Sequence, residues 1–176
     1  EILVAFAFVS KLNKESNMDI PLEDAFKRMH LNKFFMNESK KLCCFPEQNA
    51  GPDFVVIHNN TVHIFQVKLR KDPLRFEHLK HAVRTTDPEC FYSKNNGEKY
   101  GDKFGERRTE ICDVIKKKEY TIKRYLFIHG PNIVDKSKLN EIEDENKMII
   151  ISKETKPDFF ANIDASMNKK IWDYFD

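Results

Sequence analysis

The sequence predicts an α/β domain with a central mixed sheet flanked by helices. A strand–turn–strand pattern occupies Gly51 to Leu69, and two further runs of strand-like composition follow at 125–129 and 148–152. Around them, apolar residues recur every three to four positions, which is typical of helices packed on a sheet. A chain of 176 residues most simply forms one domain, 1–176, with a sizeable core. Because it begins at Glu1 rather than Met, we expect a fragment of a longer chain with additional domains.

The pattern from Gly51 to Leu69 predicts two strands joined by a turn. Phe54 to Ile57 is apolar and β-branched, Asn59-Asn60 is a turn signal, and Val62 to Leu69 is a second apolar run. Both faces of the second run are largely apolar, so we expect a central strand that is buried on both sides.

Helical and strand signals also precede this pair. Ile2 to Val9 is an apolar run too short to cross a bilayer, and it predicts a buried helix or strand. Asp19 and Pro21 begin a helix expected over 19–31. Residues 37–45, chiefly 40–45, should supply the first strand of the sheet. The apolar face of this expected helix consists of Leu22, Ala25, Phe26 and Met29.

The elements after the pair include one unusual segment. Asp72-Pro73 begins a helix expected over 73–85. Ser93 to Arg108 mixes glycines with lysines and aromatics, which is typical of a mobile loop. Helices are expected at 110–118, 135–145 and 157–176, so the C-terminal part is a helical and strand elaboration. The core face of the 73–85 helix is expected to consist of Leu74, Phe76, Leu79 and Val83.

Three polar side chains are expected to converge at one end of the central strand. Gln66 and Lys68 lie on the same face near its end, and Asp53 stands just before the preceding strand. A lysine near a buried strand end needs a carboxylate partner, because an unpaired buried charge is costly. Asp53 is the expected partner. The alternative is a turn aspartate beside a solvated lysine.

This constellation resembles the PD-(D/E)xK nuclease superfamily, which has the restriction endonuclease-like fold. The resemblance rests on Pro52-Asp53, the apolar strands, and Gln66-Val67-Lys68, where Gln replaces the usual acid as in the Mrr-like QxK branch. The expected order of helix, three strands, helix and strand is similar to the α-β-β-β-α-β core of that fold, over about residues 19 to 130.

The resemblance implies metal-dependent hydrolysis of phosphodiester bonds, most simply in DNA, with RNA as the alternative. Mg²⁺ or Mn²⁺ would be held by Asp53, by the Val67 carbonyl and by the Gln66 side-chain oxygen, with orientation of the attacking water as the alternative role of Gln66. Lys68 would stabilise charge in the transition state. An acid on the first core helix would complete the site, and Glu23 is the residue that fits. The alternatives for Glu23 are a surface pair with Lys27 and a rival acid in Asp24.

Basic residues could hold the phosphates around such a site, because the middle of the chain is basic and the C-terminal part acidic. Solvated surface charge is the alternative for each of them. The glycine-containing segment would either clamp a nucleic-acid strand or be an insertion between core elements. The candidates are Arg70, Lys71, Arg75, Lys80, Arg84, Lys99, Lys103, Arg107 and Arg108.

A second resemblance covers QVKLR and the segment HAVRTTDPECFY, which are similar to the nuclease-like domains of Crinkler and RHS-type proteins. It implies an effector acting on nuclear DNA. Two other function classes stay open: a nuclease fold that binds nucleic acid without cutting it, and a protein-interaction module. The four cysteines lack metal-binding spacing and predict a reducing, intracellular environment, with Cys43-Cys44 buried in a strand. We expect no membrane partner, and a homodimer is one expected assembly.

Overall fold

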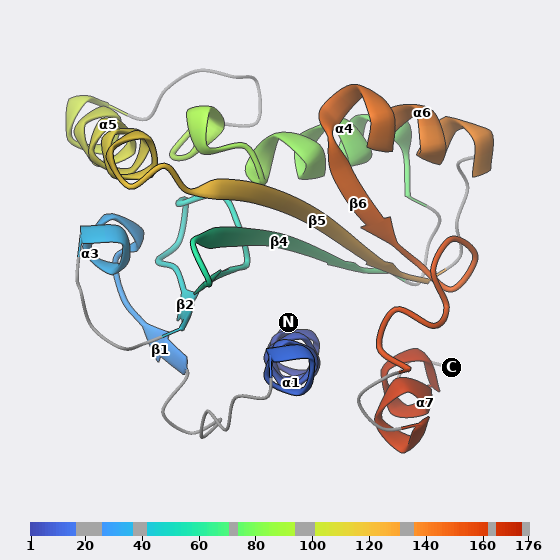
Figure 1. Cartoon of the computed structure of the whole chain (residues 1–176). Coiled ribbons are helices and arrows are strands. Elements are labelled where there is room, and N and C mark those ends of the chain that lie inside the picture. Colours follow the sequence, from blue (N-terminus) through green and yellow to red (C-terminus); the bar gives the residue numbers. More distant parts are fainter. Residues whose placement is uncertain are drawn as a thin grey trace.

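A computed structural model shows an open sheet with helices on both faces (Figure 1). It describes residues 1–16, 26–36, 42–70, 74–93, 101–130, 136–161 and 165–173. The strands are β1 (Phe26–Arg28), β2 (Cys43–Phe45), β3 (Phe54–His58), β4 (Thr61–Leu69), β5 (Thr121–His129) and β6 (Met148–Ile151). The helices are α1 (Ile2–Ser16), α3 (Leu31–Met36), α4 (Phe76–Thr85), the 3-10 turn η1 (Pro88–Cys90), α5 (Asp102–Lys117), α6 (Lys136–Asn146) and α7 (Ala165–Asp173).

The sheet has six strands in the order β1-β2-β3-β4-β5-β6. β2, β3 and β4 form an antiparallel meander, and β1, β5 and β6 pair parallel with their neighbours. Each parallel connection needs a crossover, and helices lie in these connections. The predicted α/β class with a mixed, helix-flanked sheet is therefore confirmed.

The predicted strand pair forms the centre of the sheet. β3 and β4 join at Asn59 and Asn60, whose φ angles of 46° and 57° are typical of a two-residue hairpin turn. β4 pairs with β3 on one side and along its whole length with β5 on the other. Residues 62–67 of β4 are buried, so the prediction of a central strand buried on both faces is confirmed.

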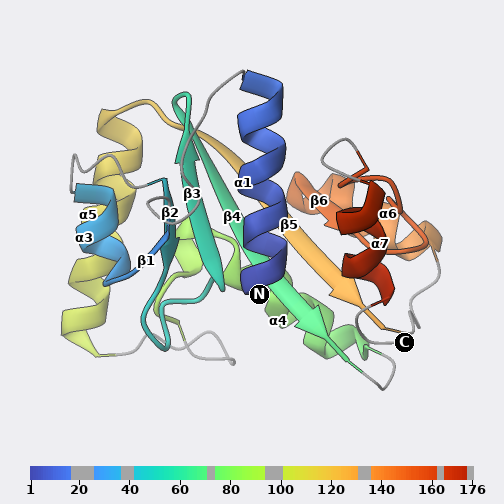
Figure 2. The same cartoon turned by 90° about the horizontal axis from the view of Figure 1, so that it is seen from below.

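Helices α1 and α7 pack on one face of the sheet (Figure 2). α1 lies across β3, β4 and β5, and its Phe8 ring packs 4.5 Å from the Phe65 ring. Phe65 in turn stacks on Phe54 and Tyr125 at 4.4 and 4.3 Å. α7 adds Trp172, which stacks on β5. The expectation of a buried N-terminal helix or strand is thus met by a helix, which runs on to Ser16.

The other face is covered by α3 and α5 at one end and by α4 and α6 at the other. Val55 and Ile64 meet the first pair of helices, and Leu126 and Ile128 meet the second. The adjacent cysteines of β2 are both fully buried, as predicted. Within the described residues, no helix is long and apolar enough to cross a membrane.

The helix predicted over 19–31 is wrong at its C-terminal part. Residues 26–28 form β1, which pairs parallel with β2, and a separate helix begins only at Leu31. A three-residue strand carries no periodicity of its own, so tertiary pairing overrides the apolar spacing that indicated a helix. Residues 17–25, including Glu23 and Asp24, lie outside the described residues.

The mobile loop predicted at 93–108 is wrong from residue 102 onward, where α5 begins. Phe104 packs against the buried Tyr92 at 5.6 Å and leads a stripe that continues through Ile111. Gly101 stands at the helix N-cap, and Gly105 lies within the helix with open space around it. Glycine therefore occupies the N-cap of α5 and one position inside it, and neither residue prevents the helix. Residues 94–100 lie outside the described residues.

Helices α7 and α4 differ from the prediction at their N-terminal ends. The helix predicted over 157–176 is replaced by turns up to Ala161, and α7 begins only at residue 165. On α4, Leu79 and Val83 are buried as predicted, whereas Phe76 is 46% exposed instead of lying in the core. Phe76 is the first residue of α4, one turn before the buried Leu79.

Candidate functional site

Asp53 and Gln66 are in contact at the C-terminal end of β4, and Lys68 lies on the same face of the strand two residues further on. The Gln66 side-chain amide donates a hydrogen bond to Asp53 Oδ2. The backbone N–H of Val67 donates to the same oxygen at 2.6 Å. Gln66 is 4% exposed, and Lys68, on the same face of β4, is half-buried. A carboxylate, an amide and an amine thus share one end of the sheet.

The chain reaches this arrangement because β3 begins one residue after Asp53. The pairing of β3 with β4 ends at Phe54 and Phe65, so no β3 residue lies opposite Val67. The Asp53 carboxylate takes that place and accepts the Val67 N–H. The N–H and C=O of one strand residue point to the same edge, so the Val67 carbonyl faces the gap beside Asp53.

Gly51 allows the turn before Asp53 to pack tightly. Its φ of +121° is one that residues with a side chain rarely adopt, and a Cβ there would lie 3.2 Å from the Thr85 carbonyl oxygen. Thr85 ends α4, and its hydroxyl donates to Gln66 Oε1 at 2.5 Å. The amide of Gln66 is therefore bound at both ends, by Asp53 and by Thr85.

Burial works against both charges of the site. Removal from water raises the pKa of Asp53 to about 6, and the Val67 N–H and the Lys68 charge offset this only in part. Burial likewise lowers the pKa of Lys68, although Asp53 and Glu1 favour its charged form. Acids and amines with strongly perturbed pKa values cluster at functional sites, which makes this end of the sheet a candidate site.

The expected ion pair between Asp53 and Lys68 is not formed, and the two charges interact over a longer distance. No ion pair of 4.0 Å or less joins Lys68 to Asp53 in the structure. Glu1, at the N-terminal end of α1, adds a second carboxylate whose charge acts on both groups. This end of α1 lies beside the C-terminal half of β4 (Figure 2). Sequence reasoning missed Glu1, because an apolar run gives no sign of where its first residue will lie.

Helix α4 supplies further polar groups that sequence reasoning missed. Burial lowers the pKa of His81, and the charges of Lys68 and Arg84 and the neighbouring His78 act in the same direction. His78 Nδ1 is buried and has no hydrogen-bond partner within the described part of the chain. The sequence predicted the 73–85 helix from its apolar positions. His78, His81 and Thr85 recur on the face toward β4, and this spacing is the signal that could have assigned them to the candidate site.

The donor set fits a divalent cation only in part. Both hydrogen bonds to Asp53 end on Oδ2, which leaves Oδ1 without a hydrogen bond from the described residues. Asp53 Oδ1, the Val67 carbonyl and the Glu1 carboxylate are hard oxygen donors of the kind Mg²⁺ prefers. Gln66 Oε1, by contrast, is occupied by Thr85. Within the described residues, no group of three or more His, Cys, Asp or Glu side chains is arranged to hold a metal ion.

The predicted nucleic-acid contacts divide into three groups. Arg70, Arg75 and Lys80 are exposed around the end of β4 and the start of α4, and Arg84 is half-buried nearby. Arg107 instead donates to Glu47 at 3.0 Å, and Arg108 is a half-buried neighbour on α5. Lys71 and Lys99 lie outside the described residues, as does the side chain of Lys103.

Glu47 explains why Arg107 is held inside the fold. Its carboxylate also accepts from the Leu31 backbone N–H and the Tyr92 hydroxyl, both at 2.8 Å. These hydrogen bonds lower the pKa of Glu47 despite its burial. Glu47 therefore joins α3 to α5, and Arg107 serves this junction rather than the surface near Asp53.

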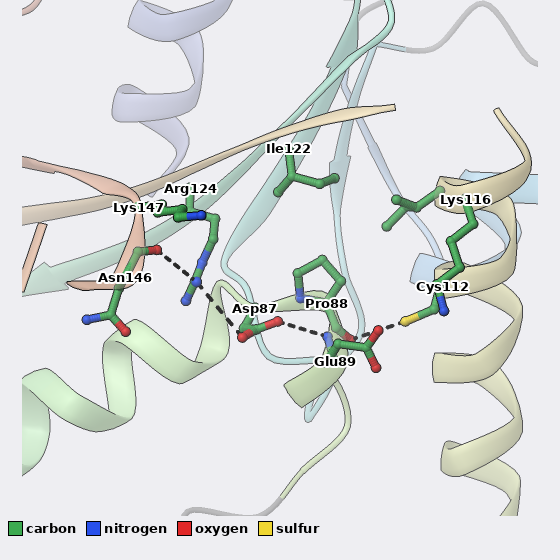
Figure 3. A pocket seen from close by; sticks show the side chains of 10 residues that line it. Asp87, Pro88, Glu89, Cys112, Lys116, Ile122, Arg124, Asn146 and Lys147 are labelled. Atoms are coloured by element: carbon green, nitrogen blue, oxygen red, sulfur yellow. Dashed lines mark hydrogen bonds and ion pairs between the residues drawn. The ribbon is translucent and has the colours of Figure 1, made fainter. Parts of the chain in front are cut away.

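A separate pocket of about 360 Å³ lies between η1, α5, the start of β5 and the end of α6 (Figure 3). Arg124 is the one arginine among the described residues that line this pocket, and its side chain is 14% exposed. Its N–H groups donate to Val83 O at 2.8 Å, Asn146 O at 3.1 Å and the Thr86 hydroxyl at 3.1 Å. Arg124 thus caps the ends of α4 and α6, and this pocket is no part of the Asp53 site.

Comparisons with protein families, with curated proteins and with solved structures found no match to this chain.

Proposed function

We propose that the protein is a metal-dependent nuclease of the restriction endonuclease-like fold that hydrolyses phosphodiester bonds, with DNA as its first substrate. The observation that carries the proposal is the convergence of Asp53, Gln66 and Lys68 where β3 leaves β4. The antiparallel meander β2-β3-β4, followed by α4 and a parallel β5, supports the same fold. Similarity to Crinkler-type domains would place the substrate in the nucleus.

In this proposal the chain's own residues hold the metal and the phosphate. Asp53 Oδ1 and the Val67 carbonyl would hold Mg²⁺ or Mn²⁺, with Glu1 or Glu23 as a further ligand. The bound metal supplies Lewis acidity and a more acidic water. Lys68 stabilises negative charge as the phosphate is attacked. Gln66 fixes the orientation of Asp53 through its amide instead of binding the metal.

A second function, nucleic-acid binding without cleavage, is favoured by one observation. Both ends of the Gln66 amide are used inside the protein, by Asp53 and Thr85, so the position that is usually an acid in this superfamily brings neither a charge nor a free oxygen. Gln66→Glu separates the two functions. It adds a carboxylate next to Asp53, and in a nuclease it should maintain or raise cleavage when metal is scarce. In a binder it creates no metal-dependent cleavage.

The experiment that tests the proposal combines metal binding with cleavage. Calorimetric titration with Mn²⁺ should show binding that Asp53→Ala abolishes, and plasmid DNA should be cut with Mg²⁺ or Mn²⁺ but not with EDTA. Glu47→Ala is the control for loss of a buried carboxylate away from the site. Mn²⁺ binding that survives in Asp53→Ala places the metal elsewhere. Absence of metal-dependent cleavage on both DNA and RNA would overturn the proposal.

A further inference from the structure

Phe76 is an aromatic side chain that the fold leaves exposed beside the candidate site. Its ring is 46% exposed at the start of α4, whereas Leu79 and Val83 of the same helix are buried. The ammonium of Lys80 lies 4.7 Å from its centroid. Two other exposed large apolar residues, Ile2 and Leu69, lie at the start of α1 and the end of β4, the elements that bring Glu1 and Lys68 to the site.

The position of Phe76 on α4 follows from how this helix meets β4. Thr85, at the C-terminal end of α4, contacts Gln66, and His81 lies within electrostatic range of Lys68. Phe76 is five residues before His81, so it lies about 7 to 8 Å further along the helix axis at 1.5 Å per residue. Phe76 therefore lies at the end of α4 that is farther from Thr85 and Gln66, and its side chain is exposed there.

The surroundings of Phe76 are positively charged. Arg70, Arg75 and Lys80 are exposed, and the ammonium of Lys80 lies over the Phe76 ring. Such a surface attracts phosphates. A protein partner is a poorer fit, because lysines are depleted in the cores of protein interfaces and one ring between cations buries little apolar area.

We propose that Phe76 is a stacking platform for one base of a single-stranded nucleic acid, whose backbone runs along Arg70, Arg75 and Lys80. The substrate of the site would then be single-stranded or locally unpaired nucleic acid. This inference rests on the proposed function for its link to cleavage. An exposed ring between cations is the arrangement that binds single strands, because each unpaired base offers a face to stack. In a duplex those faces are already stacked on neighbouring bases, so the ring cannot reach them.

Binding without metal tests the inference independently of cleavage. With EDTA present, Phe76→Trp introduces an exposed indole, and its emission should be quenched when a short oligothymidine is added. The wild-type chain is the built-in control, because its single tryptophan, Trp172, is 5% exposed and donates to the Pro157 carbonyl. The wild-type emission should not change.

Affinities of matched variants give the second measurement. Phe76→Ala should bind the single strand about 5- to 150-fold more weakly, the range for loss of one stacked base. Phe76→Tyr keeps a ring and should bind like wild type. Met36→Ala removes an equally exposed apolar side chain from α3 and should have no effect. A duplex of the same sequence should bind Phe76→Ala and wild type alike.

Three outcomes would overturn the inference. In the first, Phe76→Ala binds the single strand as tightly as wild type. In the second, Phe76→Ala weakens binding of the single strand and of the duplex equally, which would show that base stacking is not the contact. In the third, wild type self-associates and Phe76→Ala does not, which would assign the ring to a contact between copies of the chain. If base stacking on Phe76 is found but metal-dependent cleavage is not, this inference is supported and the proposed nuclease function is refuted.

Discussion

Asp53→Asn should make the metal-free protein more stable at neutral pH. A carboxyl whose pKa rises from 3.8 to about 6 on folding loses about 3 kcal/mol of stability once it is ionised, at 1.36 kcal/mol per pKa unit. Asp53 is not fully buried, so we expect a gain of roughly 1–3 kcal/mol from the neutral variant. Both hydrogen bonds to Asp53 end on Oδ2, so an asparagine oxygen in the same place can still accept from the Val67 N–H and the Gln66 amide.

The pH dependence has a definite sign. Between pH 3.8 and about 6 the folded protein holds its Asp53 proton more tightly than the unfolded chain does. Stability of the wild type therefore falls as pH rises through that window. The advantage of Asp53→Asn should be full at pH 7, shrink as pH falls through about 6, and vanish below about 4.

Urea unfolding in EDTA at several pH values measures this difference. Glu47→Gln is the matched control, because hydrogen bonds lower the pKa of Glu47 and its neutralisation should destabilise the protein at pH 7. Saturating Mn²⁺ should remove the advantage of Asp53→Asn, since only the wild-type carboxylate binds the metal. An Asp53→Asn protein that is less stable than wild type at pH 7 would identify Asp53 as a structural cap of β4 and refute the reasoning.

Two further predictions concern His63 and Arg124, which support the fold around the site. Burial lowers the pKa of His63, which bonds Tyr125 at 3.0 Å, to about 4, so the folded protein resists protonating it. Urea unfolding of wild type against His63→Gln should show wild type losing up to about 3 kcal/mol as pH falls from about 6.5 to about 4; parallel pH profiles would contradict this. Arg124→Lys keeps a charge but loses the forked bonds to Val83 and Asn146. It should cost about 2–4 kcal/mol in chemical denaturation, and an unchanged midpoint would show that these caps carry no stability.

The fold was predictable where local pattern and tertiary packing agree. β3 and β4 combine a turn sequence with apolar strands, and α4 has a strong apolar spacing, so both were identified from the sequence. β1 has three residues and exists through its pairing with β2. α5 begins in a glycine- and lysine-containing segment, and Phe104 shows its role only through contact with the distant Tyr92.

The site was predictable to the extent that strand alternation fixes it. Gln66 and Lys68 had to share a face, and the short turn had to bring Asp53 near them. The hydrogen bond from Thr85 to Gln66, the approach of Glu1 and the exposure of Phe76 depend on how α1 and α4 lie on the sheet. Helix placement is a long-range property, and no local spacing encodes it.

The central claim is that the Asp53 site cleaves phosphodiester bonds, and Lys68→Ala tests it most directly. Single-turnover cleavage and equilibrium binding should be measured on the same oligonucleotide, with Mg²⁺ for cleavage and without metal for binding. If Lys68 stabilises the transition state, the cleavage rate should fall on the order of 10²- to 10³-fold. Affinity should change far less, because Lys68 is one of several cations near the phosphates. Cleavage that persists undiminished in both Lys68→Ala and Asp53→Ala would contradict the account.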